Sequence, residues 1–151
     1  MGPLAIKRLG ANRVARSDGG SGMTIELKML AWSIVLGLAY VLIAAGLATQ
    51  QRGITWNAGN REEDAEPLTG VAGRADRASR NFLETFPFFA AAVLAVVLTH
   101  RNTDHTAMGA QIYFWARVVY WPIYAAGIPY LRTAVWIVAF WGFLQVLEAL
   151  F

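Results

Sequence analysis

The sequence contains no cysteine and few charged residues. Of its 151 residues, 15% are charged and 56% are hydrophobic, whereas a soluble domain averages about 25% charged residues. The lack of cysteine excludes disulfides, thiolate metal sites and a cysteine nucleophile, so any thiol chemistry needs a thiol supplied by a ligand. The length indicates a single domain, and the composition is typical of a membrane protein.

The main part of the sequence also lacks a basic surface. The formal net charge is +3. Five residues near the N-terminus account for all of it: Lys7, Arg8, Arg13, Arg16 and Asp18. Residues 23–151 are neutral in sum, so they do not predict binding to nucleic acid.

Histidine is scarce, and its placement does not favour a metal site. His105 ends the polar segment RNTDH and His100 directly precedes it, with no third candidate ligand nearby. We interpret them as solvated loop residues and predict no metal.

The first 22 residues differ in character from the rest. They end in the linker-like GGSG and are followed by Met23. A signal peptide is disfavoured, because no compact apolar region and cleavage site follow the basic residues. We interpret residues 1–22 as a leader or tag outside the fold and residues 23–151 as the domain.

Four segments are candidates for crossing a membrane, at about 29–48, 82–98, 107–126 and 134–151. The first has twenty residues without a charge, enough to cross a hydrocarbon core of about 30 Å as a helix. Short connections join the last three, so neighbouring helices should be antiparallel. The sequence predicts an all-α integral membrane protein built as an antiparallel four-helix bundle, with residues 50–73 as a loop on the membrane surface.

Basic residues are distributed unequally between the two ends of such a bundle. The end with the first and third loops holds six arginines: Arg52, Arg61, Arg74, Arg77, Arg80 and Arg132. Without the leader, the other end holds only Lys28 and Arg101. The arginine-rich first loop is therefore expected to be cytoplasmic.

Two of the predicted helices carry polar stripes. On the second, the spacing places four side chains on one face: Arg77, Arg80, Asn81 and Glu84. On the third, four others share a face: Tyr113, Arg117, Tyr120 and Tyr124. We expect Glu84 to pair with Arg117, because an unpaired carboxylate at membrane depth is costly. The pair could merely fix the helix register, but the remaining donors favour an anionic ligand.

A third candidate element is the turn GIPYLRT before the last span. Gly127 and Pro129 are expected to form the turn, and Thr133 to be the N-cap of the following helix. Arg132 would then stand beside the helix N-terminus, a position that favours an anion such as a thiolate. The alternative is that Arg132 only anchors the helix at the interface.

The segments RADRASRNFLETFPF and ARVVYWPIYAAGIPYLRT resemble the MAPEG family, the membrane-associated proteins of eicosanoid and glutathione metabolism, especially its small bacterial members. The resemblance implies a homotrimer of four-helix bundles that binds glutathione at subunit interfaces. It assigns glutathione binding to six residues: Arg77, Arg80, Asn81, Glu84, Tyr120 and Tyr124. It also implies that Arg132 stabilises the thiolate, that Thr133 lies beside the sulfur and that Arg52 reaches the peptide from a neighbouring subunit.

The resemblance implies a glutathione-dependent membrane transferase or peroxidase that acts on a lipophilic electrophile or hydroperoxide, in a bacterial inner membrane. Its partners would be membrane lipids, a lipophilic small molecule and further copies of the chain. Two residues depart from the animal prostaglandin synthases: Tyr120 replaces a histidine and Trp136 replaces a tyrosine. Because these departures alter the pocket, a non-catalytic membrane subunit or lipid-binding scaffold is the alternative.

Overall fold

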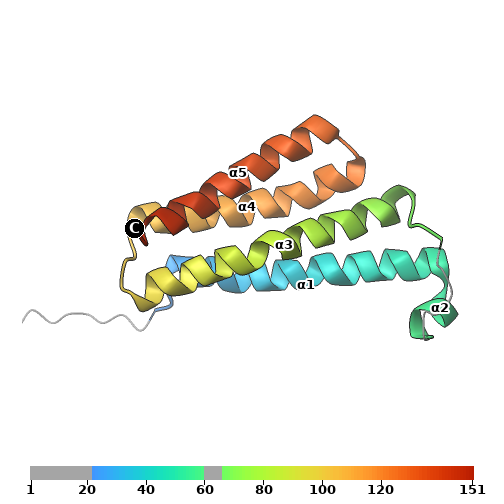
Figure 1. Cartoon of the computed structure of the whole chain (residues 1–151), viewed down its shortest axis with the longest axis horizontal. Coiled ribbons are helices and arrows are strands. Elements are labelled where there is room, and N and C mark those ends of the chain that lie inside the picture. The colour runs from blue at the N-terminus through green and yellow to red at the C-terminus, as the bar shows by residue number, and fades with distance from the viewer. Residues whose placement is uncertain (1–21, 60–65) are drawn as a thin grey trace, which may run out of the picture.

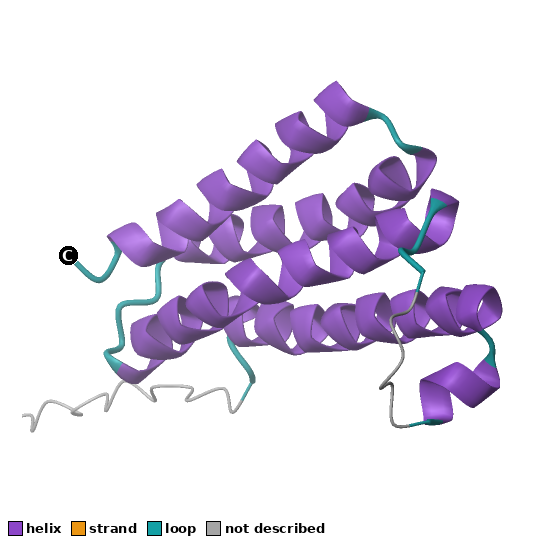
Figure 2. Ribbon diagram, turned by 45° about the vertical axis from the view of Figure 1, so that its right-hand side comes forward, coloured by secondary structure: helices purple, strands orange, loops and turns teal. Residues whose placement is uncertain are grey.

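The computed structural model describes residues 22–59 and 66–151, and all of its regular structure in that part of the chain is helical (Figure 2). The predicted leader therefore lies outside the described residues, apart from Gly22. There are five helices: α1 (Ile25–Arg52), α2 (Ile54–Ala58), α3 (Gly70–Leu98), α4 (Asp104–Ala126) and α5 (Pro129–Glu148). The four long ones run side by side along the long axis, and the short α2 lies at one end (Figure 1).

The helix ends are defined by local chemistry. At the start of α1, the Thr24 side chain accepts a hydrogen bond from the Leu27 N–H (3.3 Å). At the start of α4, Thr103 and Thr106 cap each other's backbone N–H groups. Helix α4 ends at Gly127, whose φ of 79° is left-handed and suits glycine. This turn leads directly into α5.

Two helices begin before the apolar spans predicted within them. Helix α3 starts at Gly70, ahead of the polar stripe at Arg77 and of the span predicted from residue 82, because its first turns are polar but still helix-forming, with alanines such as Ala72, Ala75 and Ala78 buried against the other helices. Helix α5 starts at Pro129 rather than Ala134, because proline lacks an N–H and suits the first helical position. Thr133 is therefore inside α5, and its predicted role as an N-cap is wrong.

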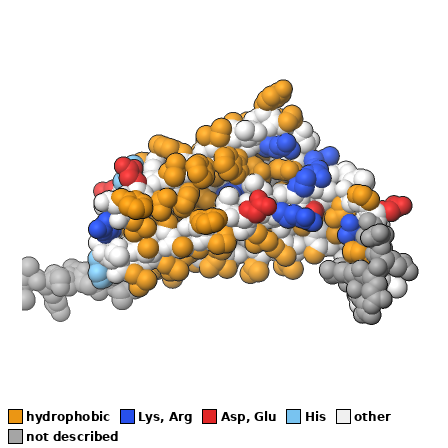
Figure 3. All heavy atoms as spheres, viewed as in Figure 1, with side chains coloured by type: hydrophobic (Ala, Val, Ile, Leu, Met, Phe, Trp, Pro, Cys, Tyr) orange, Lys and Arg blue, Asp and Glu red, His pale blue; other side chains and the backbone are white. Residues whose placement is uncertain are grey.

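Three of the helices are long and apolar enough to cross a membrane: α1, α3 and α5. Helix α4 is not among them, although it was predicted as a span. It packs on α1, α3 and most extensively on α5, so much of its polar surface is covered by protein. Apolar side chains cover the visible middle of the molecule, and basic ones gather near the turn between α4 and α5 and the start of α3 (Figure 3).

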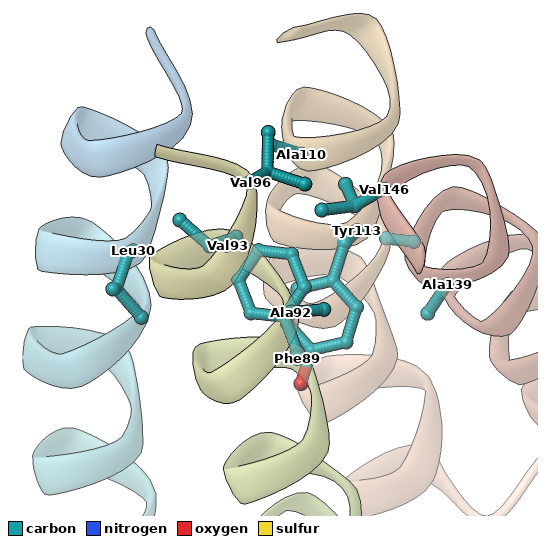
Figure 4. Close-up of a cluster of buried hydrophobic side chains, with 10 residues drawn as sticks. Leu30, Phe89, Ala92, Val93, Val96, Ala110, Tyr113, Ala139 and Val146 are labelled. Carbon is teal, nitrogen blue, oxygen red and sulfur yellow. The ribbon is translucent and has the colours of Figure 1, made fainter. Parts of the chain in front are cut away.

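The interior has two apolar clusters. One surrounds Phe89 and Tyr113, whose rings stack with centroids 3.8 Å apart (Figure 4). The other contains Tyr40, Phe82, Tyr120 and Tyr124. The second cluster lies beneath the basic end of the molecule and supports the residues described next.

Candidate functional site

Three helices form a hollow of about 130 Å³ at the basic end. Its lining comes from α3 (Asn81), α4 (Tyr120) and α5 (Arg132, Thr133 and Trp136). We call it the polar hollow. Four of these five residues are site residues predicted from the sequence, and the fold brings them together from segments separated by up to 52 positions.

Arg132 lies in the first turn of α5 and forms part of the wall of the polar hollow. Its guanidinium carbon is 4.9 Å from the centre of the Tyr124 ring, a distance at which a cation is attracted to an aromatic face. The Thr133 hydroxyl donates to the Pro129 carbonyl (3.2 Å). The Tyr124 ring thus stabilises the Arg132 guanidinium, and the first turn of α5 positions the Arg132 side chain at the polar hollow.

Arg117 is the most deeply buried charged residue that the structure describes, with 1% of its surface exposed. Its Nη1 donates to Asn81 Oδ1 (2.9 Å), and its Nη2 donates to Thr85 Oγ1. The Tyr40 hydroxyl donates to its backbone carbonyl (2.6 Å). A buried guanidinium is thus held by neutral acceptors on α3 and anchored to α1 through Tyr40.

The predicted ion pair between Glu84 and Arg117 is wrong for the described chain. Glu84 is exposed, and the ion pair found among the described residues joins Arg80 Nη2 to Asp76 Oδ2 (3.1 Å). The reason is the rotation of α3. Asn81 and Thr85, one turn apart, face α4, whereas Glu84 lies about 60° to 100° around the helix from them.

The contact with Arg117 also determines what Asn81 presents to a ligand. Because Asn81 Oδ1 accepts from Arg117 (2.9 Å), the Nδ2 amide group is the end left for the polar hollow. Asn81 therefore faces the hollow as a hydrogen-bond donor. Together with Arg132, it gives this hollow the donors that an anion requires, and no carboxylate of the described residues lines it.

A larger groove of about 570 Å³ lies between α1, α2 and the start of α3 and holds three more of the predicted binding residues, whereas Glu84 and Tyr124 line neither hollow. Three predicted arginines line it, together with Asp76: Arg52, Arg77 and Arg80. We call it the arginine groove. Arg52 donates from Nε and Nη2 to the Glu66 carbonyl (3.2 and 3.0 Å) and lies over the Trp56 ring at 4.5 Å. The predicted site is thus divided between two hollows, with Arg80 and Asn81, adjacent in α3, lining one each.

Sequence reasoning missed two residues that organise the polar hollow. Thr85 holds Arg117 and follows Asn81 by four positions, so the helical period could have indicated it. Arg74 donates from Nε to the Ala125 carbonyl (2.7 Å), which ties the start of α3 to the end of α4. No local pattern indicates that second contact, because its partner is a backbone group 51 residues away.

These features define an integral membrane protein made of packed helices, with a donor-rich hollow near one end. A model of the MAPEG family matches residues 29–147, and the chain belongs to that family. Members of the family generally use glutathione. No curated protein matches the chain.

Proposed function

We propose that this protein is a glutathione-dependent membrane transferase or peroxidase that acts on a lipophilic electrophile or hydroperoxide. The observation that carries the proposal is the polar hollow, where Asn81, Arg132 and Thr133 converge from two helices. A fixed guanidinium beside a thiol favours the thiolate, which is the nucleophilic form. This chain has no cysteine of its own, and glutathione supplies such a thiol.

The two hollows suit the thiol and the carboxylates of glutathione. An extended tripeptide spans about 10 Å, and Arg77 and Asn81 are one turn apart on α3, about 6 Å along its axis. The sulfur belongs in the polar hollow, beside Arg132 and Thr133, with Tyr120 and Tyr124 beneath. The carboxylates belong with Arg77 and Arg80, whose guanidinium groups are exposed, and Glu84 suits the ammonium group.

We further propose four membrane spans in a homotrimer, in a bacterial inner membrane, with the arginine-rich first loop cytoplasmic. The packing supports α4 as the second-to-last span, because α1, α3 and α5 all pack on it and its single central charge, Arg117, is buried. A helix shielded from lipid needs less apolar surface. In a trimer, Arg52 of a neighbouring subunit would contact the bound peptide.

Turnover by the purified full chain tests the enzyme proposal. We expect glutathione-dependent conjugation of 1-chloro-2,4-dinitrobenzene or reduction of cumene hydroperoxide, with the rate lost in Arg132→Ala. Arg101→Ala is the matched control, because Arg101 is an exposed arginine at the opposite end of the molecule, bonded to the Ala149 carbonyl. Binding of glutathione without any turnover would overturn the enzyme proposal in favour of a non-catalytic membrane subunit.

A further inference from the structure

A second, smaller cavity lies between α3, α4 and α5, with a volume of about 40 Å³. Four aromatic side chains form most of its wall: Phe88, Trp136, Phe140 and Phe143. We call it the aromatic cavity. Its volume exceeds the roughly 15 Å³ that one water needs, so it has room for a group of a few atoms. Phe88 and Phe140 are exposed on the outer surface, so the cavity lies directly beneath the apolar exterior.

The remainder of the wall is polar and has unused hydrogen-bonding capacity. Thr85, Tyr113 and Arg117 line this part. The Tyr113 hydroxyl and Arg117 Nε are buried without a hydrogen-bond partner in the described part of the chain, and the two residues are only 2% and 1% exposed. A buried donor without a partner destabilises the protein, so a ligand that offers an accepting oxygen here would gain hydrogen bonds that the free protein lacks.

The character of the wall limits what the occupant can be. Four aromatic rings disfavour a hydrated ion, and an entirely apolar molecule would leave both donors unsatisfied. The occupant that fits is an apolar molecule with one hydrogen-bond-accepting oxygen. The cation at Arg117, which has no carboxylate partner among the described residues, favours an oxygen with partial negative charge.

The aromatic cavity also adjoins the polar hollow. Trp136 lines both of them. Arg117, in the wall of the cavity, holds Asn81, in the wall of the hollow, through its Nη1. A molecule whose oxygen reaches Arg117 would therefore lie against the same indole as a ligand beside Arg132.

The geometry points to the aromatic cavity as the binding site for an apolar, oxygen-bearing molecule that approaches between α3 and α5, with Tyr113 and Arg117 donating to its oxygen. Its use as the subsite of the lipophilic co-substrate rests on the proposed function. Binding of the oxygen-bearing molecule does not rest on the proposed function, because neither Tyr113 nor Arg117 is proposed to bind glutathione.

A pair of isosteric probes tests this assignment on the full chain without glutathione. Acetophenone carries one carbonyl oxygen, and α-methylstyrene has a CH2 group in its place. We expect the wild type to bind acetophenone about fivefold to tenfold more tightly, the value of about one hydrogen bond, as measured by saturation-transfer NMR titration. The ratio of the two affinities cancels most of the partitioning of both probes into detergent.

Two tyrosine variants provide the matched comparison. In Tyr113→Phe the preference for acetophenone should fall by a factor of about two or more without vanishing, because Arg117 Nε still donates, and the melting temperature should be unchanged or raised, because the lost hydroxyl has no partner. In Tyr40→Phe the preference should stay at the wild-type value while the melting temperature falls, because that hydroxyl donates to the Arg117 carbonyl. A wild type without preference, or a preference that is undiminished in Tyr113→Phe, would overturn the assignment.

Glutathione titration separates this inference from the proposed function. Tyr113→Phe should bind glutathione as the wild type does, since Tyr113 lines only the aromatic cavity of the two. If the wild type shows the acetophenone preference but binds no glutathione, the proposed function fails and the cavity assignment stands. If glutathione binds normally and the preference is absent, the cavity assignment fails alone.

Discussion

At the scale of single residues, Arg117 organises this end of the molecule. It is buried, its guanidinium is held by Asn81 and Thr85, and its carbonyl accepts from Tyr40. One of these contacts orients a residue of the polar hollow, whereas the other two stabilise helix packing. The roles of Asn81 and Thr85 can therefore be separated by mutation.

Asn81→Leu and Thr85→Val each remove one acceptor from the same guanidinium. Both should destabilise the protein by about 1–3 kcal/mol, because each leaves a buried donor unsatisfied, and thermal unfolding measures this loss. Only Asn81→Leu should also weaken glutathione binding, since Asn81 lines the polar hollow and Thr85 does not. Equal losses of glutathione affinity in the two variants would mean that Asn81 does not contact the ligand.

Arg80 and Arg132 should affect different kinetic constants. Arg80 lies in the arginine groove, where it would bind a carboxylate equally in substrate and transition state, so Arg80→Ala should mainly raise the KM for glutathione. Arg132 lies in the polar hollow and acts on the sulfur, so Arg132→Ala should mainly lower kcat. Steady-state kinetics with varied glutathione measures both. A rise in KM with unchanged kcat in Arg132→Ala would contradict its assignment to the thiolate.

The residue-scale predictions from sequence were right where the spacing along one helix decided them. Helical spacing selected Asn81 and Tyr120, and both line the polar hollow. Pairing across helices was harder, because it depends on how each helix is rotated about its axis. A rotation of about one residue position exposes Glu84 and gives Arg117 two neutral acceptors instead.

At the scale of helices, hydropathy predicted the existence and order of the four long ones better than their ends. Hydropathy reports which residues face lipid, whereas the backbone hydrogen bonds of α3 begin twelve residues earlier, at Gly70. The predicted start of α5 was wrong for a local reason: the helix begins at Pro129, four residues before the predicted N-cap Thr133. The short connection predicted that α4 and α5 are neighbours, and they do pack together, but the close approach at Gly109 and Gly142 was not predicted.

Gly142 is expected to be essential to the contact between α4 and α5. A Cβ at this position would lie 2.7 Å from the Gly109 carbonyl oxygen and 2.7 Å from the Tyr113 N, and backbone atoms cannot move aside cheaply. Gly142→Ala should therefore destabilise the protein by about 1–3 kcal/mol in thermal unfolding.

Gly46→Ala is the control for this prediction. Gly46 is inside α1 with no atom within 4 Å of an added Cβ, so the change should be neutral or slightly stabilising. A Gly142→Ala variant as stable as Gly46→Ala would show that α4 and α5 pack less closely than described.

At the scale of the whole molecule, the domain predicted from sequence at residues 23–151 contains the entire helical structure that is described. The exposed apolar surface suits a bilayer or further copies of the chain (Figure 3). Sequence could not predict that the predicted site residues divide between two hollows, because this depends on the space left between packed helices. In the proposed trimer, a neighbouring subunit would complete the arginine groove.

Deletion of residues 1–22 should leave membrane insertion and oligomer size unchanged, because they carry the excess positive charge and include none of the predicted spans or site residues. Membrane fractionation and the mass of the detergent-solubilised particle measure the outcome, with the full chain as the control. We expect the mass of a trimer in both cases. Loss of the assembled particle on deletion would show that the leader belongs to the fold.

The central claim is that Arg132 holds the sulfur of glutathione as a thiolate in the polar hollow. Its most direct test is the ultraviolet thiolate absorbance of bound glutathione as a function of pH, in the wild type, Arg132→Ala and Arg101→Ala. A guanidinium beside the sulfur lowers the thiol pKa, so the wild type and Arg101→Ala should show thiolate at a pH where free glutathione is still a thiol. Removing the cation should shift this signal to higher pH in Arg132→Ala. A wild type without the thiolate signal, or an Arg132→Ala variant that titrates as the wild type does, would contradict the account.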